Sequence, residues 1–214
     1  MLAYTAAVSG VNFVNLSRIT ISMEFTLLYQ GSLRSNGGPA HKQELRRAFH
    51  PQLQRLWQLE PLKSNRAYVA YPPIAPTACD PQLSLLQSVR NFTFAPLISE
   101  RLYLAAQLSI TLLRPERPGQ IIKQMGDIDN RLKTLFDALC VPPHPNQIPK
   151  EDAPSSDEMP FFCLLQDDCL VTKVSVDTQR LLTVDDTVSK SHVVILVHVK
   201  TQVTKPVASA LEFL

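Results

Sequence analysis

The chain has 214 residues, which is enough for one domain of ordinary size with a substantial buried core. Hydrophobic residues make up 45% of it and charged residues 19%, and the formal net charge of +2 excludes a strong overall field that would attract a polyanion. Any affinity for nucleic acid must therefore come from a local basic patch. No apolar run approaches the ~18 residues of a membrane helix, so we predict no membrane span.

The four cysteines are Cys79, Cys140, Cys163 and Cys169. They form no Cys-x-x-Cys pair, and no His-x-x-x-His pair accompanies them, so a structural zinc site is not predicted. We expect reduced thiols rather than disulfides, which is typical of a cytoplasmic protein. No motif indicates a small organic cofactor.

The first 22 residues lack the basic start and long apolar core of a signal peptide. A second methionine, Met23, directly precedes a strand-like run. We therefore expect residues 1–22 to be a poorly ordered leader or a misassigned start, and residues 23–214 to form a single domain.

The run MEFTLLYQG, from Met23, is predicted to be the first strand, and the turn-rich GSLRSNGGP ends it. The next segment, AHKQELRRAFHPQLQRLW, repeats apolar residues such as Leu45, Phe49 and Leu53 at helical spacing. Pro51 lies inside this pattern, so we expect a kink or a fresh start of the helix there.

Residues 60–90 show no clean period and contain a proline-rich loop, with a short helix expected after it. NFTFAPLIS and RLYLAAQLSITLLRP are predicted to form a hairpin or two neighbouring strands. In the second, alternate residues from Ala106 to Leu112 are apolar, as in a strand with one buried face. FFCLLQDD and CLVTKVSVDTQRL are strand material, and HVVILVHVKT resembles a well-buried last strand. The total is about five strands and two or three helices, with helices covering one face of a sheet: an α+β fold.

The segment GDIDNRLKTLFDALC, from Gly126 to Cys140, is predicted to form an amphipathic helix starting near Asp129. Four apolar residues cluster on one side of that helix and are expected to pack on the sheet: Leu132, Leu135, Phe136 and Leu139. The opposite side is a polar stripe, formed by Asn130, Lys133, Thr134 and Asp137.

Two interpretations of the aspartates at the start of this helix stay open. In the first, Asp129 caps the helix, Asp127 favours its positive end, and Lys133 pairs with Asp137. In the second, Asp127 and Asp129 share a divalent cation, because Mg²⁺ prefers carboxylate oxygens. The Asp-x-Asp motif alone does not decide, since it recurs in glycosyltransferases, phosphatases and nucleotidyltransferases.

A second acidic pair, Asp167 and Asp168, follows the apolar run FFCLL. Adjacent carboxylates inside strand material repel each other and resist desolvation unless a cation compensates. An exposed turn is the alternative. Together the two motifs describe an acidic cluster of the type that nucleases use to hold a metal ion. Such an ion generates a hydroxide and neutralises charge on the phosphoryl transition state.

These two segments, GDIDNRLKTLFDAL and LLQDDCLV, resemble the RusA family of Holliday-junction resolvases. The family pattern is Asp-x-Asp-Asn-x-x-Lys-x-x-x-Asp-Ala-Leu followed by a hydrophobic run into Asp-Asp, and every fixed residue of it is present. The resemblance implies that the catalytic carboxylates Asp127, Asp129 and Asp168 bind Mg²⁺, with Mn²⁺ as a substitute. It also implies a two-layer mixed β-sheet with helices packed on one face, and a C2 homodimer.

The resemblance further implies roles for four neighbouring residues. Lys133 would contact the scissile phosphate or steady the attacking water. Asn130 and Asp137 would support the metal ligands, and Asp167 would be an auxiliary acid. The chain departs from the family in a long insertion at about residues 141–160, which we expect to cover the site or to alter the substrate. The family's loop near the N-terminus is only loosely matched by GSLRSNGG.

Basic residues are concentrated in one early segment and around the first acidic motif. We expect them to contact DNA phosphates, with a steep dependence on salt, although a solvated helix face is the alternative for any one of them. They are Arg34, Lys42, Arg46, Arg47, Arg55, Arg114, Arg117 and Lys123.

The leading hypothesis is a Mg²⁺-dependent, structure-selective endodeoxyribonuclease. It would act on branched or four-way-junction DNA in recombination, repair or phage DNA processing, as a homodimer that matches the two-fold symmetry of the junction. One alternative is a non-catalytic junction-binding protein that retains the fold. A nucleotidyltransferase is less favoured, because Gly31-Ser32 lies far upstream of the aspartates and Lys133 has no role in that chemistry.

Overall fold

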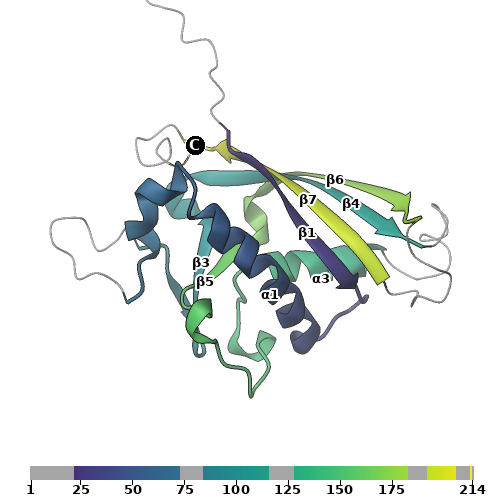
Figure 1. Ribbon diagram of the computed structural model, residues 1–214, viewed down its shortest axis with the longest axis horizontal. Helices are drawn as coiled ribbons and strands as arrows, with labels where there is room; N and C mark the ends of the chain where they lie inside the picture. The colour runs from purple at the N-terminus through teal and green to yellow at the C-terminus, as the bar shows by residue number, and fades with distance from the viewer. Residues whose placement is uncertain (1–21, 73–83, 116–127, 183–191, 206–212, 214) are drawn as a thin grey trace, which may run out of the picture.

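The computed structural model describes residues 22–72, 84–115, 128–182, 192–205 and 213 (Figure 1). The larger of its two sheets has the strand order β1-β7-β4-β6 and contains β1 (Glu24–Ser32), β4 (Leu104–Arg114), β6 (Val171–Arg180) and β7 (His192–Val203). The smaller has the order β2-β3-β5 and contains β2 (Gln87–Val89), β3 (Phe92–Ile98) and β5 (Phe161–Leu165). The α-helices are α1 (Pro39–Leu56) and α3 (Ile128–Leu139). The leader predicted at residues 1–22 lies, except for its last residue, outside the described residues.

The larger sheet is mixed. Strand β7 pairs antiparallel with β1 and with β4, whereas β4 and β6 run parallel. The near-continuous apolar run of β7 is buried only at alternate positions, from Val193 to Val199, while His198 is exposed. The expected burial of this strand is therefore confirmed for one face, and the other face of the sheet is open to solvent.

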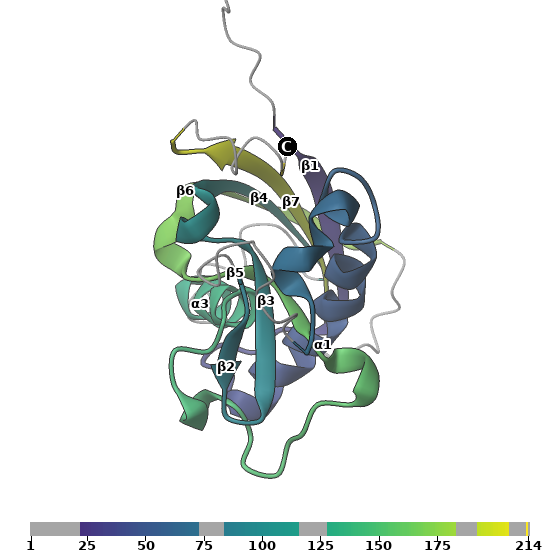
Figure 2. The same ribbon diagram turned by 90° about the vertical axis from the view of Figure 1, so that its left-hand side faces the viewer.

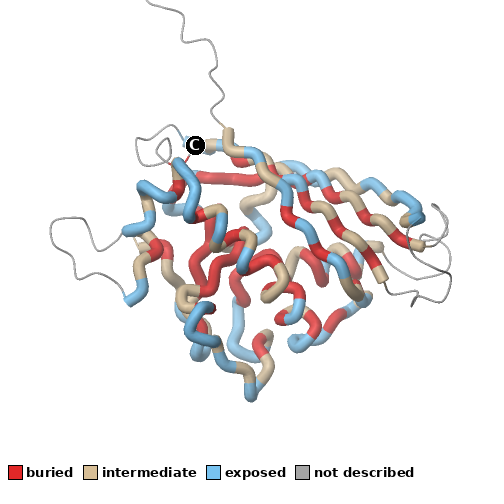
Figure 3. The backbone as a smooth tube through the Cα atoms, in the orientation of Figure 1, coloured by how far each residue is buried: buried red, intermediate tan, exposed pale blue. Residues whose placement is uncertain are grey.

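The core lies between the larger sheet and the elements beneath it. Figure 2 shows this sheet arching over α1, α3 and the smaller sheet, and Figure 3 shows the buried backbone gathered between them. The predicted alternation along β4 is confirmed, because Ala106, Leu108, Ile110 and Leu112 are at most 2% exposed. They join one apolar cluster with buried residues of α1, α3, β5 and β7. The predicted α+β arrangement, a mixed sheet with helices on one face, is thus confirmed.

The prediction that β3 and β4 form a hairpin or two neighbouring strands is wrong, because the two strands belong to different sheets. Strand β3 pairs with β2 and β5, and the chain then turns at residues 99–103 before entering β4. Tyr103 ends this turn in the left-handed backbone region, with φ of 51°. Aromatic side chains of the smaller sheet form a second cluster, in which Phe161 contacts Phe92 and Phe94 at ring separations of 5.6 and 5.3 Å.

Helix α1 continues through Pro51, so the predicted fresh start is wrong. Its apolar side packs in the core, where Leu45, Phe49 and Leu53 are at most 2% exposed, whereas Pro51 lies on the exposed side. Tertiary packing of a long apolar face stabilises the helix enough to outweigh the hydrogen bond that a proline removes. Among the described residues, no helix has the length and hydrophobicity needed to span a membrane.

Candidate metal and nucleic-acid site

The first acidic motif lies at the start of α3. This helix begins at Ile128, directly after the undescribed residues 116–127, so Asp127, Arg117 and Lys123 lie outside the described residues. Asp129 is in the first helical turn and Lys133 is one turn further on, and both are exposed. Neither side chain forms an ion pair within the described part of the chain. The fold therefore leaves this carboxylate and this ammonium group open to solvent.

The rest of the predicted polar stripe packs against the region where α1 begins. Thr134 is 2% exposed, and its hydroxyl donates to the carbonyl of Asn130 at 2.9 Å and accepts from the N–H of Gly37 at 3.0 Å. The contact is close: a Cβ on Gly37 would lie 2.7 Å from the Thr134 methyl group. Asp137 pairs with Lys42 of α1 at 2.7 Å. The expected Lys133–Asp137 pair is therefore replaced by a pair between helices.

Arg131 also anchors α3, a role that the sequence reasoning missed. It is 7% exposed, and its guanidinium donates a hydrogen bond to the carbonyl of Leu33, just after β1. Its spacing could have revealed this, because Arg131 precedes the buried Leu135 and Leu139 by four and eight residues and so shares their side of the helix.

The second acidic pair forms an exposed turn between β5 and β6. Asp167 precedes the short 3-10 turn Asp168–Leu170, and its carboxylate accepts a hydrogen bond from the backbone N–H of Cys169 at 2.9 Å. Hydrogen bonds from Cys169 lower the pKa of Asp167, and a further one with Asp168 acts in the same direction. Both carboxylates are exposed, so the alternative of a solvated turn is the one observed.

This turn lies beside the C-terminal end of α3. The backbone N–H of Val141 donates to the carbonyl of Leu165 at 3.0 Å, and Cys140 forms an isolated bridge with the same residue. Burial raises the pKa of the Cys140 thiol, and the nearby charges of Asp168 and Asp167 raise it further. The acidic pair therefore adds negative charge near the end of the helix that already carries the negative pole of its dipole.

The two acidic motifs consequently meet different ends of α3. Asp129 is in the first turn, about 16 Å along the axis from Cys140 at 1.5 Å per residue, whereas Asp168 is near Cys140. Within the described ranges, no group of three or more His, Cys, Asp or Glu side chains is arranged to hold a metal ion. The structure thus brings Asp167 and Asp168 together but does not bring Asp129 into a described metal group with them. The predicted role of Asp127 as a metal ligand stays a prediction, because this residue lies outside the described part of the chain.

Arg46 does not present its charge at the surface, although the sequence predicted a phosphate contact. It is 1% exposed and donates to the carbonyl of Asp137 at 2.8 Å and to that of Gln147 at 3.2 Å. Burial lowers its pKa to about 10. Arg114, at the end of β4, is 2% exposed. For both arginines the expected surface contact with DNA is wrong, because their side chains are built into the core.

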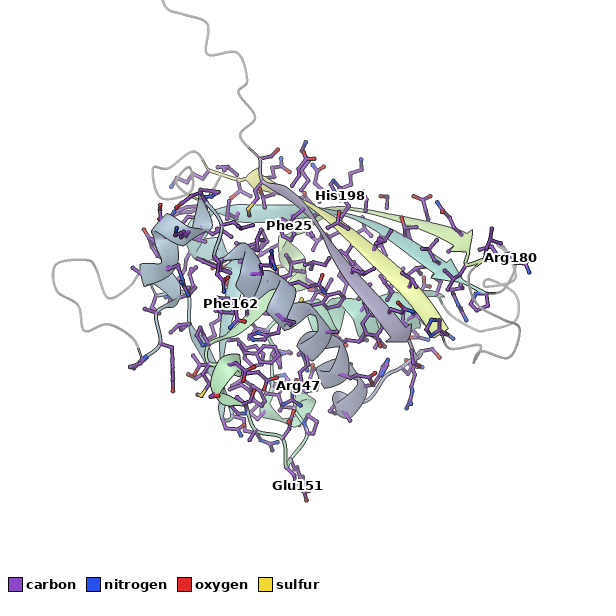
Figure 4. All side chains as sticks on the ribbon, viewed as in Figure 1. Phe25, Arg47, Glu151, Phe162, Arg180 and His198 are labelled. Atoms are coloured by element: carbon purple, nitrogen blue, oxygen red, sulfur yellow. The ribbon has the colours of Figure 1, made fainter. Side chains whose placement is uncertain are left out.

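Arg47 and Lys42 are engaged in ion pairs within the protein. Arg47 lies 2.7 Å from Glu158 and 2.8 Å from Asp152, and the hydrogen bond with Glu158 raises its pKa. Figure 4 shows Arg47 on the side of α1 that faces the segment carrying Glu151. Of the early basic residues, Arg34 and Arg55 are exposed, and for these the predicted DNA contact stays a prediction.

The insertion at residues 141–160 is anchored to α1 and to the turn between β2 and β3. Arg90 donates to the carbonyl of Pro149 at 2.8 Å, and the side chain of Asn91 to that of Asp152 at 2.9 Å. On the other side, His50 of α1 contacts the carbonyl of Asp157 at 3.2 Å. These contacts bind the insertion to the fold itself. Of its acidic side chains, Asp152 and Glu158 pair with Arg47 of α1, whereas Glu151 is exposed.

Comparisons of the chain with known protein families, with curated proteins and with solved structures gave no match.

Proposed function

We propose that the protein is a metal-dependent, structure-selective endodeoxyribonuclease that acts on branched DNA such as four-way junctions, in the cytoplasm, during recombination, repair or phage DNA processing. The proposal rests on the resemblance of two separated motifs to the RusA family. One structural observation carries it: of the charged residues around α3, the fold engages Lys42, Arg46 and Asp137 but leaves Asp129, Lys133 and Asp168 in solvent. Residues left unused by the fold are available for a ligand.

The donor chemistry of these residues fits Mg²⁺, with Mn²⁺ as a substitute. Asp167 and Asp168 offer adjacent carboxylates beside the negative end of α3, and Asp129 and Asp127 offer carboxylates at its start. A bound divalent ion would supply a hydroxide and neutralise developing phosphate charge. Lys133, exposed one turn from Asp129, would contact the scissile phosphate.

A second candidate is a junction-binding protein without turnover. It is favoured by one observation, which is that Asp129 and Asp168 meet opposite ends of α3. Carboxylates that share one Mg²⁺ each lie about 2.0–2.1 Å from it, so Asp129 and Asp168 become common ligands only if the turn that carries Asp168 moves toward the start of α3 when the junction binds.

Cleavage of a synthetic four-way junction, with and without Mg²⁺, tests the proposal. We expect metal-dependent nicking by the natural protein and its loss in Asp127→Asn and Asp168→Asn. Glu151→Gln is the matched control, because it removes an exposed carboxylate at the tip of the insertion (Figure 4). Absence of nicking, or nicking that survives both substitutions, would overturn the nuclease proposal. Metal-independent binding of the junction without nicking would establish the second candidate.

A further inference from the structure

The two edges of the larger sheet differ in how they are covered. On β1, the side chain of Gln52 in α1 accepts from the N–H of Leu28 at 2.9 Å and donates to its carbonyl at 2.7 Å. This amide occupies the middle of the edge as a neighbouring strand would. On the opposite edge, β6 pairs with β4 and has no second strand among the described residues. None of the 10 residues of β6 is buried. An open edge of this kind is a template for a further strand.

The sequence of β6 is complementary to itself when it is read in the opposite direction. The run TKVSVDT, from Thr172 to Thr178, has Ser175 at its centre, a valine on each side of it, and a threonine at each end. The two remaining positions carry opposite charges, Lys173 and Asp177. When two such strands pair antiparallel, Ser175 lies opposite Ser175, each valine lies opposite a valine and each threonine opposite a threonine. Lys173 of each strand then lies opposite Asp177 of the other.

The orientation of the side chains agrees with this register. Lys173, Ser175 and Asp177 are in register with the outward-facing residues 107, 109 and 111 of β4, so all three lie on the solvent face of the sheet. Val174 and Val176 point to the other face. A two-fold axis perpendicular to the sheet keeps the solvent faces of both copies on one side, and residues directly opposite each other then share a face.

The exposure of one of these valines is also consistent with pairing of β6 to a further strand. Val174 is 45% exposed, one of the few large apolar side chains of the described chain that is so open to solvent. Opposite Val176 of a second copy it would be covered. Shifting the register by one full side-chain repeat would place Lys173 opposite Ser175 or Gln179 and would leave both charges without an opposite charge directly across. The ends of β6 match as well. Figure 4 shows Arg180 at the end of this strand, and in the paired register it would lie opposite Leu170 of the second copy, two residues from Asp168.

We propose that two copies of the chain associate by antiparallel pairing of their β6 strands, centred on Ser175. The pairing joins two four-stranded sheets into one continuous sheet. It forms two Lys173–Asp177 ion pairs and two Val174–Val176 contacts, and the interface is isologous, as a C2 dimer requires. The inference stands on β6 alone and does not depend on the proposed nuclease activity.

Charge exchange tests both the interface and its register in the full chain. Sedimentation equilibrium should show a dimer for the natural protein. Lys173→Asp and Asp177→Lys, each alone, place like charges opposite each other, so each should weaken the dimer at least tenfold. The double substitution restores opposite charges and should recover it. Thermal unfolding of each variant checks that the exposed substitutions leave the monomer folded. A monomer at all concentrations, or a dimer that the single substitutions do not weaken, would overturn the proposal.

A cross-link at the centre gives an independent measurement. Ser175→Cys should be joined to its copy by a short bifunctional maleimide, because the two residues face each other across the axis. It is made with Cys169→Ser, which removes the exposed thiol of the described residues, and with Cys79→Ser, since Cys79 lies outside them. Thr178→Cys in the same background is the control, since its counterpart lies far along the strand from it. Efficient linking of Thr178→Cys without linking of Ser175→Cys would contradict the register.

Discussion

The basic residues of α1 and the acidic residues of the two motifs are both clusters of like charge in the sequence, but the fold treats them differently. Three of the four lysines and arginines of α1 are engaged within the protein, because Arg46 is buried and Lys42 and Arg47 form ion pairs, and the fourth is the exposed Arg55. The acidic motifs keep Asp129 and Asp168 in solvent. A cluster of charge thus indicates a ligand site only where the fold supplies no countercharge of its own.

The largest effect is expected at Arg46, whose guanidinium satisfies the carbonyls of Asp137 and Gln147. Arg46→Ala removes both bonds and the packing of a buried side chain, and it leaves two partly buried carbonyl oxygens without this donor. The free energy of unfolding should therefore fall by about 3 kcal/mol. Chemical denaturation measures this. Arg55→Ala, on the same helix but exposed, is the control and should change stability by no more than about 0.5 kcal/mol. Equal losses of stability in the two variants would mean that burial does not determine how much each arginine contributes to the free energy of unfolding.

A smaller effect is expected at Arg47, which is partly exposed but pairs with the nearly buried Glu158. Arg47→Ala should reduce the free energy of unfolding by about 1 kcal/mol, allowing for screening by solvent. It should also make residues 141–160 more susceptible to limited proteolysis, because the insertion loses its tether to α1. If the rate of cleavage in this segment is unchanged, the ion pairs do not hold the insertion.

The pH dependence of stability should depend on His50. Its Nδ1 accepts from the N–H of Phe162 at 2.9 Å, so this nitrogen is unprotonated, and burial lowers the pKa of the ring. The unfolded chain, with a histidine pKa of about 6.5, therefore binds a proton more readily than the folded one. Stability should be constant above that pH and should fall as the pH decreases below it. His50→Asn keeps an acceptor but does not titrate, and it should flatten the profile between pH 5 and about 7. A profile unchanged by this substitution would assign the dependence to other groups.

The smallest effect on stability is expected at the exposed motif residues. Asp129→Asn and Lys133→Ala remove groups that form no ion pair within the described residues, so unfolding free energies should change by about 0.5 kcal/mol or less. Junction cleavage, in contrast, should be lost. A large loss of stability in either variant would indicate a structural role. The charged residues of the motif would then be engaged by the fold just as those of α1 are.

Periodicity predicted the elements that have one buried face. The strand at β1, the helix at α1 and the alternation in β4 are confirmed, because a repeating apolar pattern reports which side of an element meets the core. Periodicity does not name the neighbour, however, and so the sheet that β3 joins was not predicted. The Lys42–Asp137 pair joins residues far apart in the chain, and no local pattern encodes such a contact.

The burial of charged residues could be predicted from the sequence only in part. Arg131 shares the helical spacing of Leu135, so its burial could have been predicted. Arg46 was predicted to contact DNA, and its burial could not be predicted because the carbonyls that it binds belong to other segments. The exposure of Asp167 and Asp168 depended on whether the chain turns after β5, which the apolar run alone did not settle.

Whether the two acidic motifs hold a metal ion together is the central question, and titration of Mn²⁺ into the junction-bound protein answers it most directly. The account predicts binding of Mn²⁺ that is lost in Asp168→Asn and equally lost in Asp129→Asn, whereas Glu151→Gln binds as the natural protein does. Binding that is absent, or that survives the substitution of either motif, would contradict it.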